Sequence, residues 1–341
     1  WGGVMGLKLS SVPFEISYPA QSFGVEIENL KLHKNLSFDT IAAIKKCLAY
    51  RGFVLFRNQN LTRREQVAVT RLLGNPNLKL HSWAPQIETT TFGDDEVIPN
   101  GLPLINHGEI LYFVNGPDFC EKTQDEHAIW DEKDNHTKGK GTSCWHTGDS
   151  EAINVETINC LYAELAAAQG GATLFCDTVA AYNDLEDSLK KRIDNLRVVH
   201  YFVDPQRTEP VNQPLVKINP ITRQKYLYLN YNTMERVEGL SKSESYRLLK
   251  FLFDHQIKDQ YVYEHFWKQD DFLIWNCNGT MHKRGALVSN HNRIMRRTQA
   301  IIPEFTSYYE RDKSLAVTSH DNEDWHPYPF ERAELESAGS A

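Results

Sequence analysis

The chain has 341 residues, of which 41% are hydrophobic and 24% are charged, which is ordinary for a folded globular protein and excludes the disordered and fibrous classes. Its formal net charge of −8 argues against a surface for a nucleic acid polymer, because such a surface needs clustered Lys and Arg. The six cysteines include no Cys-x-x-Cys pair, and no apolar run approaches the roughly 18 residues that span a bilayer. We therefore expect a cytoplasmic protein with reduced thiols that binds neither nucleic acid nor membrane.

The first part of the chain predicts scaffold. Apolar residues recur at helical spacing over 37–49, where Ser37 can cap the start of a helix. A short buried strand is expected over 52–56. A second helix should begin at Thr62, which forms a capping-box pattern with the residue three positions later, and should end at Gly74 as a left-handed C′ residue.

The stretch 75–142 predicts long loops with short strands near 103–106 and 110–114. Loops of this length inside a compact domain are functional lids or solvated excursions, and the sequence leaves both interpretations open. His81 and His107 lie in this stretch. They would contact a substrate if the stretch covers the site, although exposed or structural roles are more common for single histidines.

The second half of the chain is rich in strands. The segment 158–165 predicts a strand that turns at Gln-Gly-Gly and returns over 173–175 as a hairpin. No linker or internal repeat divides the chain, so we expect one catalytic domain over 1–341, ending in a polar tail at 315–341. The remaining expected elements are two short helices (the second near 185–196), a strand over 197–202, two strands within 216–229, an amphipathic helix over 241–255, and strands over 272–275 and 293–302.

The segment 145–149 has the sequence Trp-His-Thr-Gly-Asp and resembles half of an iron site. Side chains two residues apart in a strand point the same way, so a carboxylate is expected two positions after His146. Gly148 occupies that position, and Asp149 would reach the same face only through a bulge. With His282 as a second imidazole, the pattern suits a redox metal with open coordination positions.

The chain resembles the taurine dioxygenase family of Fe(II)/2-oxoglutarate enzymes over about 23–302. The resemblance implies a mainly β protein with flanking helices and a double-stranded β-helix (jelly-roll, cupin-like) core that uses Fe(II), 2-oxoglutarate and O2. It is carried by Tyr-Arg-Gly-Phe-Val-Leu-Phe-Arg (50–57), Trp-His-Thr (145–147), Gly-Gly-Ala-Thr-Leu-Phe (170–175), Asn-Pro-Ile-Thr-Arg-Gln-Lys (219–225), Ile-Trp-Asn-Cys-Asn (274–278) and the segment 282–297.

The resemblance assigns roles by position. His146 and His282 would be the two imidazole ligands of iron. Thr173 and Arg293 would hold the distal carboxylate of 2-oxoglutarate, since a buried carboxylate needs a charge-assisted partner. Arg297 would lie near the metal-bound end of the co-substrate and the anionic group of the substrate.

Arg297 also has a simpler interpretation as a surface cation on an outer strand. If that strand alternates regularly, Arg296 and not Arg297 is expected to be the surface residue.

Gly148 departs from the family pattern, which has Asp at this position. The radical halogenases are similar in this respect, because Gly or Ala replaces the carboxylate and chloride takes the vacated position on iron. The favoured prediction is therefore a halogenase that chlorinates an unactivated C–H bond of a small metabolite, nucleotide or amino-acid-like, in natural-product biosynthesis. Its cofactors would be Fe(II), 2-oxoglutarate, O2 and chloride, with Gly148 beside the halide.

Two alternatives stay open. The first is a hydroxylase that keeps its metal through Asp149, or one whose native Asp has been replaced by Gly148. The second is a catalytically inactive ligand-binding relative, which is less favoured because both histidines persist with Thr173 and Arg293. The sequence identifies neither the substrate nor the oligomeric state, and a homo-oligomer is compatible with it.

Overall fold

A computed structural model describes residues 12–20, 23–76, 104–107 (backbone only), 109–115, 145–148, 150, 157–200, 210–231, 233–287 and 291–306. The predicted tail at 315–341, His81, Asp149 and most of the predicted lid lie outside these residues. None of the helices in the described ranges is long and apolar enough to cross a membrane.

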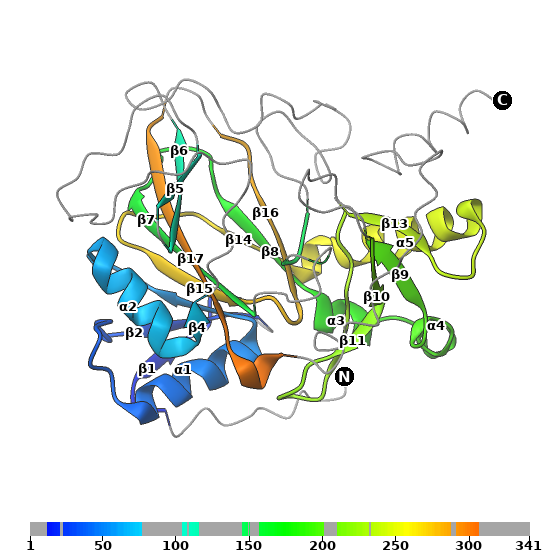
Figure 1. Cartoon of the computed structure of the whole chain (residues 1–341), viewed down its shortest axis with the longest axis horizontal. Coiled ribbons are helices and arrows are strands. Elements are labelled where there is room, and N and C mark those ends of the chain that lie inside the picture. The colour runs from blue at the N-terminus through cyan, green and yellow to red at the C-terminus, as the bar shows by residue number, and fades with distance from the viewer. Residues whose placement is uncertain are drawn as a thin grey trace.

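Two β-sheets face each other and form the core of a jelly roll (Figure 1). The smaller sheet runs in the order β14 (Val262–His265), β8 (Thr173–Asp177) and β16 (Thr280–Arg284). The larger sheet has the order β1 (Glu15–Ser17), β2 (Val25–Glu28), β3 (Phe53–Phe56), β15 (Phe272–Asn276), β7 (Ile158–Leu165), β17 (Arg293–Ile301), β6 (Ile110–Asn115) and β5 (Leu104–His107), with β4 (Asn75–Pro76) paired to β17.

The space between the sheets is filled by an apolar cluster to which both sheets contribute. Phe53, Trp275 and Met295 come from the larger sheet, and Phe175 comes from the smaller one. The rings of Phe53 and Phe175 stack with centroids 5.3 Å apart. This contact holds the two sheets face to face and defines an inner side for every strand around it.

Helices cover the outer faces of both sheets. α1 (Phe38–Arg51) and α2 (Arg63–Leu73) pack on the larger sheet through a second apolar cluster, and they lie together at the lower left of Figure 1. A third cluster joins the outer face of the smaller sheet to α3 (Thr178–Asn183) and α5 (Lys242–Gln256). The remaining elements lie on that side: α4 (Asp187–Ile193), β9 (Arg197–His200), β10 (Val211–Pro214), β13 (Met234–Val237) and the β11 (Val216–Ile218) and β12 (Lys225–Leu227) hairpin.

The helices begin where the sequence predicts. The Ser37 side chain accepts a hydrogen bond from the backbone N–H of Thr40 at the start of α1. Thr62 and Glu65 form both hydrogen bonds of a capping box at α2, and α5 starts with the same arrangement after Ser241. The strands expected near 103–106 and 110–114 and over 158–165, 272–275 and 293–302 are also present, with the bounds 104–107, 110–115, 158–165, 272–276 and 293–301.

The expected hairpin between 158–165 and 173–175 is wrong. β7 pairs with β15 and β17 in the larger sheet, whereas β8 pairs with β14 and β16 in the smaller one. Both strands are buried almost throughout, so their apolar pattern cannot reveal which strand each one joins. The Gly-Gly turn between them carries the chain from one sheet to the other.

Gly74 is also not the left-handed residue that was expected, because its φ is −169°. A Cβ there would lie 2.6 Å from the carbonyl oxygen of Ile301 in β17. Glycine is therefore required by the close approach of two backbones as α2 runs into β4.

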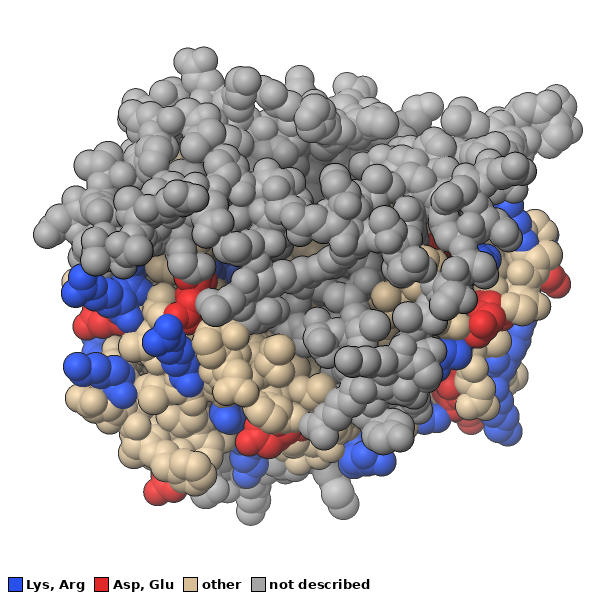
Figure 2. Space-filling view, in the orientation of Figure 1, with Lys and Arg blue, Asp and Glu red and all other residues tan. Residues whose placement is uncertain are grey.

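Charged side chains are mixed in sign over the surface. On the face shown in Figure 2, Lys and Arg alternate with Asp and Glu across the part that the structure describes. Some charged residues form ion pairs, as do Lys225 and Asp194, with an N–O distance of 2.6 Å.

The capping box of α2 gives a direct test of the fold. We expect Thr62→Ala to lower the free energy of unfolding by about 1 kcal/mol, because the backbone N–H of Glu65 loses the hydroxyl that accepts its hydrogen bond. Urea unfolding followed by circular dichroism measures this change. Thr62→Ser, which keeps the hydroxyl, is the control, and equal stability of both variants would contradict the assignment.

Candidate active site

His146 and His282 lie side by side, and His282 is the middle residue of β16. Their backbones form a reciprocal pair of hydrogen bonds, 2.9 Å from the His146 nitrogen to the His282 oxygen and 2.8 Å in the opposite direction. Their ring centroids are 4.2 Å apart. The fold thus brings together two imidazoles that are 136 positions apart in the sequence.

The His282 ring is in a state that can bind a metal. Burial, followed by the nearby charges of His146 and Arg297, lowers the pKa of His282 well below its ordinary value. Its Nδ1 is buried and has no hydrogen-bond partner among the described residues. A neutral imidazole with an unused ring nitrogen is the form that ligates metals.

The turn that follows His146 is held by hydrogen bonds on both sides. The Thr147 hydroxyl donates to the carbonyl oxygens of Cys277 and Thr280, at 3.2 and 3.1 Å. Beyond Gly148, the backbone nitrogen of Ser150 donates to the Gly148 carbonyl at 2.7 Å. Gly148 therefore has a fixed backbone position two residues after the histidine.

Within the described ranges, no third His, Cys, Asp or Glu joins the two imidazoles. Gly148 has no side chain and therefore offers no ligand atom two positions after His146. Asp149 lies outside the described residues, so its use as a ligand stays a prediction.

A buried polar chain supports this turn from behind. The Asn230 amide donates to the Ser150 hydroxyl at 2.8 Å and to the Thr147 carbonyl at 3.3 Å. The Ser150 hydroxyl contacts that of Thr233 at 2.8 Å, and Thr233 contacts His200 Nδ1 at 2.8 Å. Sequence reasoning missed these residues, because they come from separate segments without a shared motif.

Arg293 is a buried cation at the start of β17. Arg293 is only 3% exposed. Burial, followed by the charge of Arg284, lowers the pKa of Arg293 to about 9. It therefore remains charged at neutral pH. No hydrogen bond or ion pair of this guanidinium with a described residue is present, so the site favours an anion there.

Thr173 and Gly171 complete this anion-favouring environment. The Thr173 hydroxyl accepts a hydrogen bond from the Trp267 indole nitrogen at 2.9 Å, which leaves the hydroxyl proton available for an acceptor. Gly171 has a φ of +66°, and a Cβ there would lie 3.0 Å from Arg293 Nε. The guanidinium thus packs directly against the Gly-Gly turn that leads into Thr173.

Arg297 faces the interior and not the solvent. It is two residues after Met295 in β17, so the two side chains lie on the same face of the sheet. Met295 belongs to the cluster between the sheets. The guanidinium carbon of Arg297 is 5.4 Å from the centre of the Phe113 ring. Arg297 therefore points from the larger sheet into the interior that also holds His282 of the smaller sheet. The charge of Arg297 helps to lower the pKa of His282.

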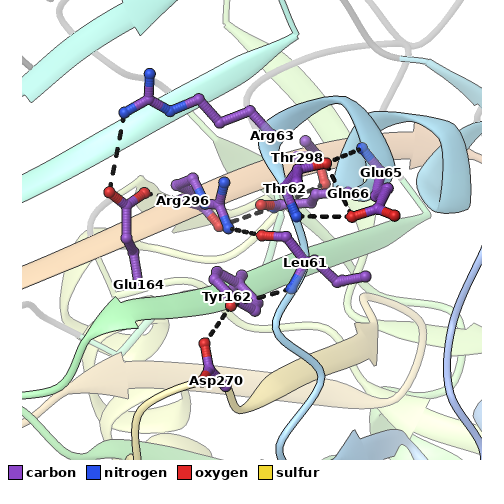
Figure 3. A network of polar contacts seen from close by, with 10 residues as sticks. All are labelled: Leu61, Thr62, Arg63, Glu65, Gln66, Tyr162, Glu164, Asp270, Arg296 and Thr298. Carbon is purple, nitrogen blue, oxygen red and sulfur yellow. Dashed lines mark hydrogen bonds and ion pairs between the residues drawn. The ribbon is translucent and has the colours of Figure 1, made fainter. Parts of the chain in front are cut away.

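The expectation that Arg296 is a surface residue is wrong. It is 3% exposed, donates to the Leu61 carbonyl at 2.5 Å and pairs with Glu164 at 3.3 Å. Its guanidinium carbon lies 4.2 Å from the centre of the Tyr162 ring. Figure 3 shows why: the start of α2 and the segment before it cover this outer face of the sheet.

The two loop histidines are not brought to the site by any described contact. His107 ends β5 at the edge of the larger sheet, and its side chain lies outside the description. His81 lies wholly outside the described residues. Substrate contact by either residue stays a prediction.

His200 predicts a pH dependence of stability. Burial, followed by the charge of Lys217, lowers the pKa of His200 from 6.5 to about 3. Between these pH values the unfolded chain binds one more proton at this residue than the folded chain does, so acid favours unfolding. We expect wild-type stability to fall, relative to His200→Asn, by up to about 1.4 kcal/mol per pH unit below pH 6.5.

Urea unfolding of both proteins at about pH 7 and about pH 5 measures this difference. The Asn variant keeps a polar side chain opposite Thr233 but cannot titrate. Parallel loss of stability in the two proteins would show that His200 is not the group responsible.

The sequence of the chain matches a known protein family and several of its characterised members. The model of the "Taurine catabolism dioxygenase TauD, TfdA family" matches residues 15–299. The alpha-ketoglutarate-dependent 2,4-dichlorophenoxyacetate dioxygenase of Cupriavidus pinatubonensis is 22% identical, over 82% of this chain and 94% of its own. The alpha-ketoglutarate-dependent sulfate ester dioxygenase of Pseudomonas putida is 24% identical, over 82% and 86%.

Solved structures share the fold. A taurine dioxygenase from Burkholderia xenovorans superposes with a TM-score of 0.69 at 20% identity, covering 90% of this chain and 96% of its own. The structure of AAD-2 in complex with Mn(II) and N-oxalylglycine gives a TM-score of 0.63 at 22% identity, covering 84% and 96%. With two facing sheets, two adjacent imidazoles and a family match over most of its length, the chain belongs to the TauD, TfdA family of Fe(II)/2-oxoglutarate-dependent dioxygenases.

Proposed function

We propose that the chain is an Fe(II)/2-oxoglutarate-dependent oxygenase that hydroxylates a C–H bond of a small anionic metabolite. The observation that carries this proposal is the pair of adjacent imidazoles, His146 and His282, with ring centroids 4.2 Å apart. Bound iron would supply the redox chemistry that couples the oxidative decarboxylation of 2-oxoglutarate to oxidation of the substrate.

The residues present fit the metal and the co-substrate. His146 and His282 would hold iron, because the buried Nδ1 of His282 has no described partner and the ring is neutral at neutral pH. Arg293 and Thr173 would hold the distal carboxylate of 2-oxoglutarate. A carboxylate placed there would receive hydrogen bonds from a guanidinium and a hydroxyl and would neutralise a buried charge.

An anionic substrate is proposed from Arg297 and from the relatives. Arg297 is a cation on the inner face whose charge acts on His282, so it can orient an anionic group beside the metal. The related enzymes are named for dichlorophenoxyacetate, a sulfate ester and phenoxypropionate, all of which carry one. The nucleotide and amino-acid-like substrates suggested by the sequence resemblance satisfy the same condition.

Chlorination is a second candidate, and Gly148 is the observation that favours it. The residue offers no carboxylate two positions after His146, which leaves room on a metal held by two imidazoles. Chloride is an anion that could fill such a position and lower the local positive charge. The sequence alone favoured chlorination, whereas the relatives support hydroxylation because they are named as dioxygenases.

Gly171 gives a test of the co-substrate assignment. We expect Gly171→Ala to weaken binding of 2-oxoglutarate by roughly tenfold or more, because the new Cβ would displace Arg293 and strain a backbone with positive φ. Anaerobic calorimetry with the Fe(II)-loaded protein measures the affinity. Gly239→Ala is the matched control, since Gly239 also has positive φ but has no atom within 4 Å of an added Cβ.

Equal affinities of the two alanine variants would contradict the placement of the carboxylate beside Arg293. If both variants bind 2-oxoglutarate more weakly and both are less thermally stable, the loss of affinity would instead come from a general effect of backbone strain.

Gly148→Asp distinguishes the two candidate reactions. We expect the variant to bind Fe(II) more tightly, because a carboxylate is added two residues after His146. If the wild type chlorinates, its anaerobic Fe(II)/2-oxoglutarate absorbance changes on addition of chloride, and the variant loses this response. If the wild type hydroxylates, neither protein responds to chloride.

Mass spectrometry of products formed from a panel of small anionic metabolites, with and without chloride, identifies the added atom. Gly148→Ala, which adds no ligand, is the control. Absence of 2-oxoglutarate binding to the Fe(II)-loaded wild type would instead support the inactive ligand-binding relative.

A further inference from the structure

A row of three residues crosses the smaller sheet at the end that carries Thr173. Thr173 in β8 pairs with His265 in β14 on one side and with Arg284 in β16 on the other. Directly paired residues of antiparallel strands have their side chains on the same face of the sheet. The Thr173 hydroxyl contacts Trp267 of the cluster between the sheets, so this row faces the interior.

The position of Arg284 along its own strand gives the same orientation. It is two residues beyond His282, and side chains two apart in a strand lie on one face. The intervening Lys283 points to the other side, where its ammonium lies 5.2 Å from the centre of the Trp145 ring, within the outer cluster. Arg284 is therefore an inward residue and not one of the surface cations.

Arg284 and Arg293 come from opposite sheets and both lie beside the segment 171–173, because Arg284 is paired with Thr173 and Arg293 packs against Gly171. After burial, the charge of Arg284 is the factor that lowers the pKa of Arg293. Arg284 is half-buried and its Nη1 donates to the Gly285 carbonyl at 3.0 Å. Two like charges in a low-dielectric interior repel each other, and an anion bound by both would offset this repulsion.

The third member of the row does not supply positive charge. His265 is fully buried, and burial lowers its pKa despite the opposing effect of Asp271. Its Nε2 is 3.3 Å from an Asp271 oxygen, and that carboxylate also pairs with Arg57 at 2.6 Å. His265 thus belongs to a neighbouring polar group. Among the described residues around this row, the positive charge comes from Arg284, paired with Thr173, and from Arg293, packed against Gly171.

We propose that Arg284 is a further binding residue of the co-substrate site, contacting the distal carboxylate of the 2-oxo acid together with Arg293 and Thr173. This inference rests on the proposed function, because that function places the carboxylate there. A carboxylate has about four lone-pair sites on its two oxygens, enough for a hydroxyl and two guanidinium groups. The second arginine makes the site selective for dicarboxylic over monocarboxylic 2-oxo acids.

The test compares two ligands that differ only at the distal end. Calorimetric titrations under nitrogen use the Fe(II)-loaded protein with 2-oxoglutarate and with 2-oxopentanoate, in which a methyl group replaces the distal carboxylate. We expect Arg284→Ala to weaken 2-oxoglutarate binding by roughly 10- to 100-fold. Its affinity for 2-oxopentanoate should change by less than about threefold.

Matched variants separate charge from packing. Arg284→Lys should recover part of the affinity for 2-oxoglutarate, whereas Arg284→Gln should resemble Arg284→Ala. Arg192→Ala, which removes an exposed cation from α4, should leave both affinities unchanged. Thermal unfolding monitors the fold, and if Arg284→Ala does not fold, the Gln and Lys pair makes the same comparison.

The outcomes are distinct. If the wild type binds 2-oxoglutarate and both Arg284→Ala and Arg284→Gln bind it as tightly as the wild type does, the role of Arg284 is overturned and the proposed function is left intact. An equal loss for both ligands also overturns it, because the effect would then not involve the distal carboxylate. Failure of the Fe(II)-loaded wild type to bind 2-oxoglutarate overturns the proposed function and this inference together.

Discussion

Two backbone hydrogen bonds between His146 and His282 hold the candidate site together. They join the segment 145–148 to strand β16, and the ring centroids of the two imidazoles are 4.2 Å apart. The geometry depends on neighbours on both sides, because Thr147 is tied to the turn before β16 and Ser150 is tied to Asn230. A site built on such a fixed backbone is preorganised, so little order has to be gained when a metal binds.

Burial leaves the imidazoles neutral and the guanidinium of Arg293 charged. His282 and His200 are kept neutral by burial, whereas Arg293 stays charged although it is almost wholly buried. A buried cation is costly for a fold unless it is paired. Arg293 makes no hydrogen bond or ion pair with a described residue, and the proposed ligand would supply the negative charge. His146, His282 and Arg293 thus match a ligand that binds a metal at one end and offers a carboxylate to Arg293 at the other.

Most of the local structure could be predicted from the sequence, because it depends on short-range physics. The capping boxes at Thr62 and Ser241 act over three residues, and the strands at 158–165 and 272–276 are apolar runs bounded by turns. Strand partners could not be predicted in this way. β7 and β8 look like a hairpin, yet they belong to different sheets, since strands buried on both faces carry no signal of which neighbour they join.

For the site, the sequence by itself determined the family, the candidate residues and the missing carboxylate at Gly148, because residue type and spacing in a strand are local properties. Only the tertiary structure decided which side chains meet. It placed Arg296 beneath α2 and not on the surface, put Arg284 in register with Thr173, and joined His200 to the turn after His146 through Thr233 and Ser150. These contacts link residues far apart in the chain, and they exist only once two sheets have closed on a common interior.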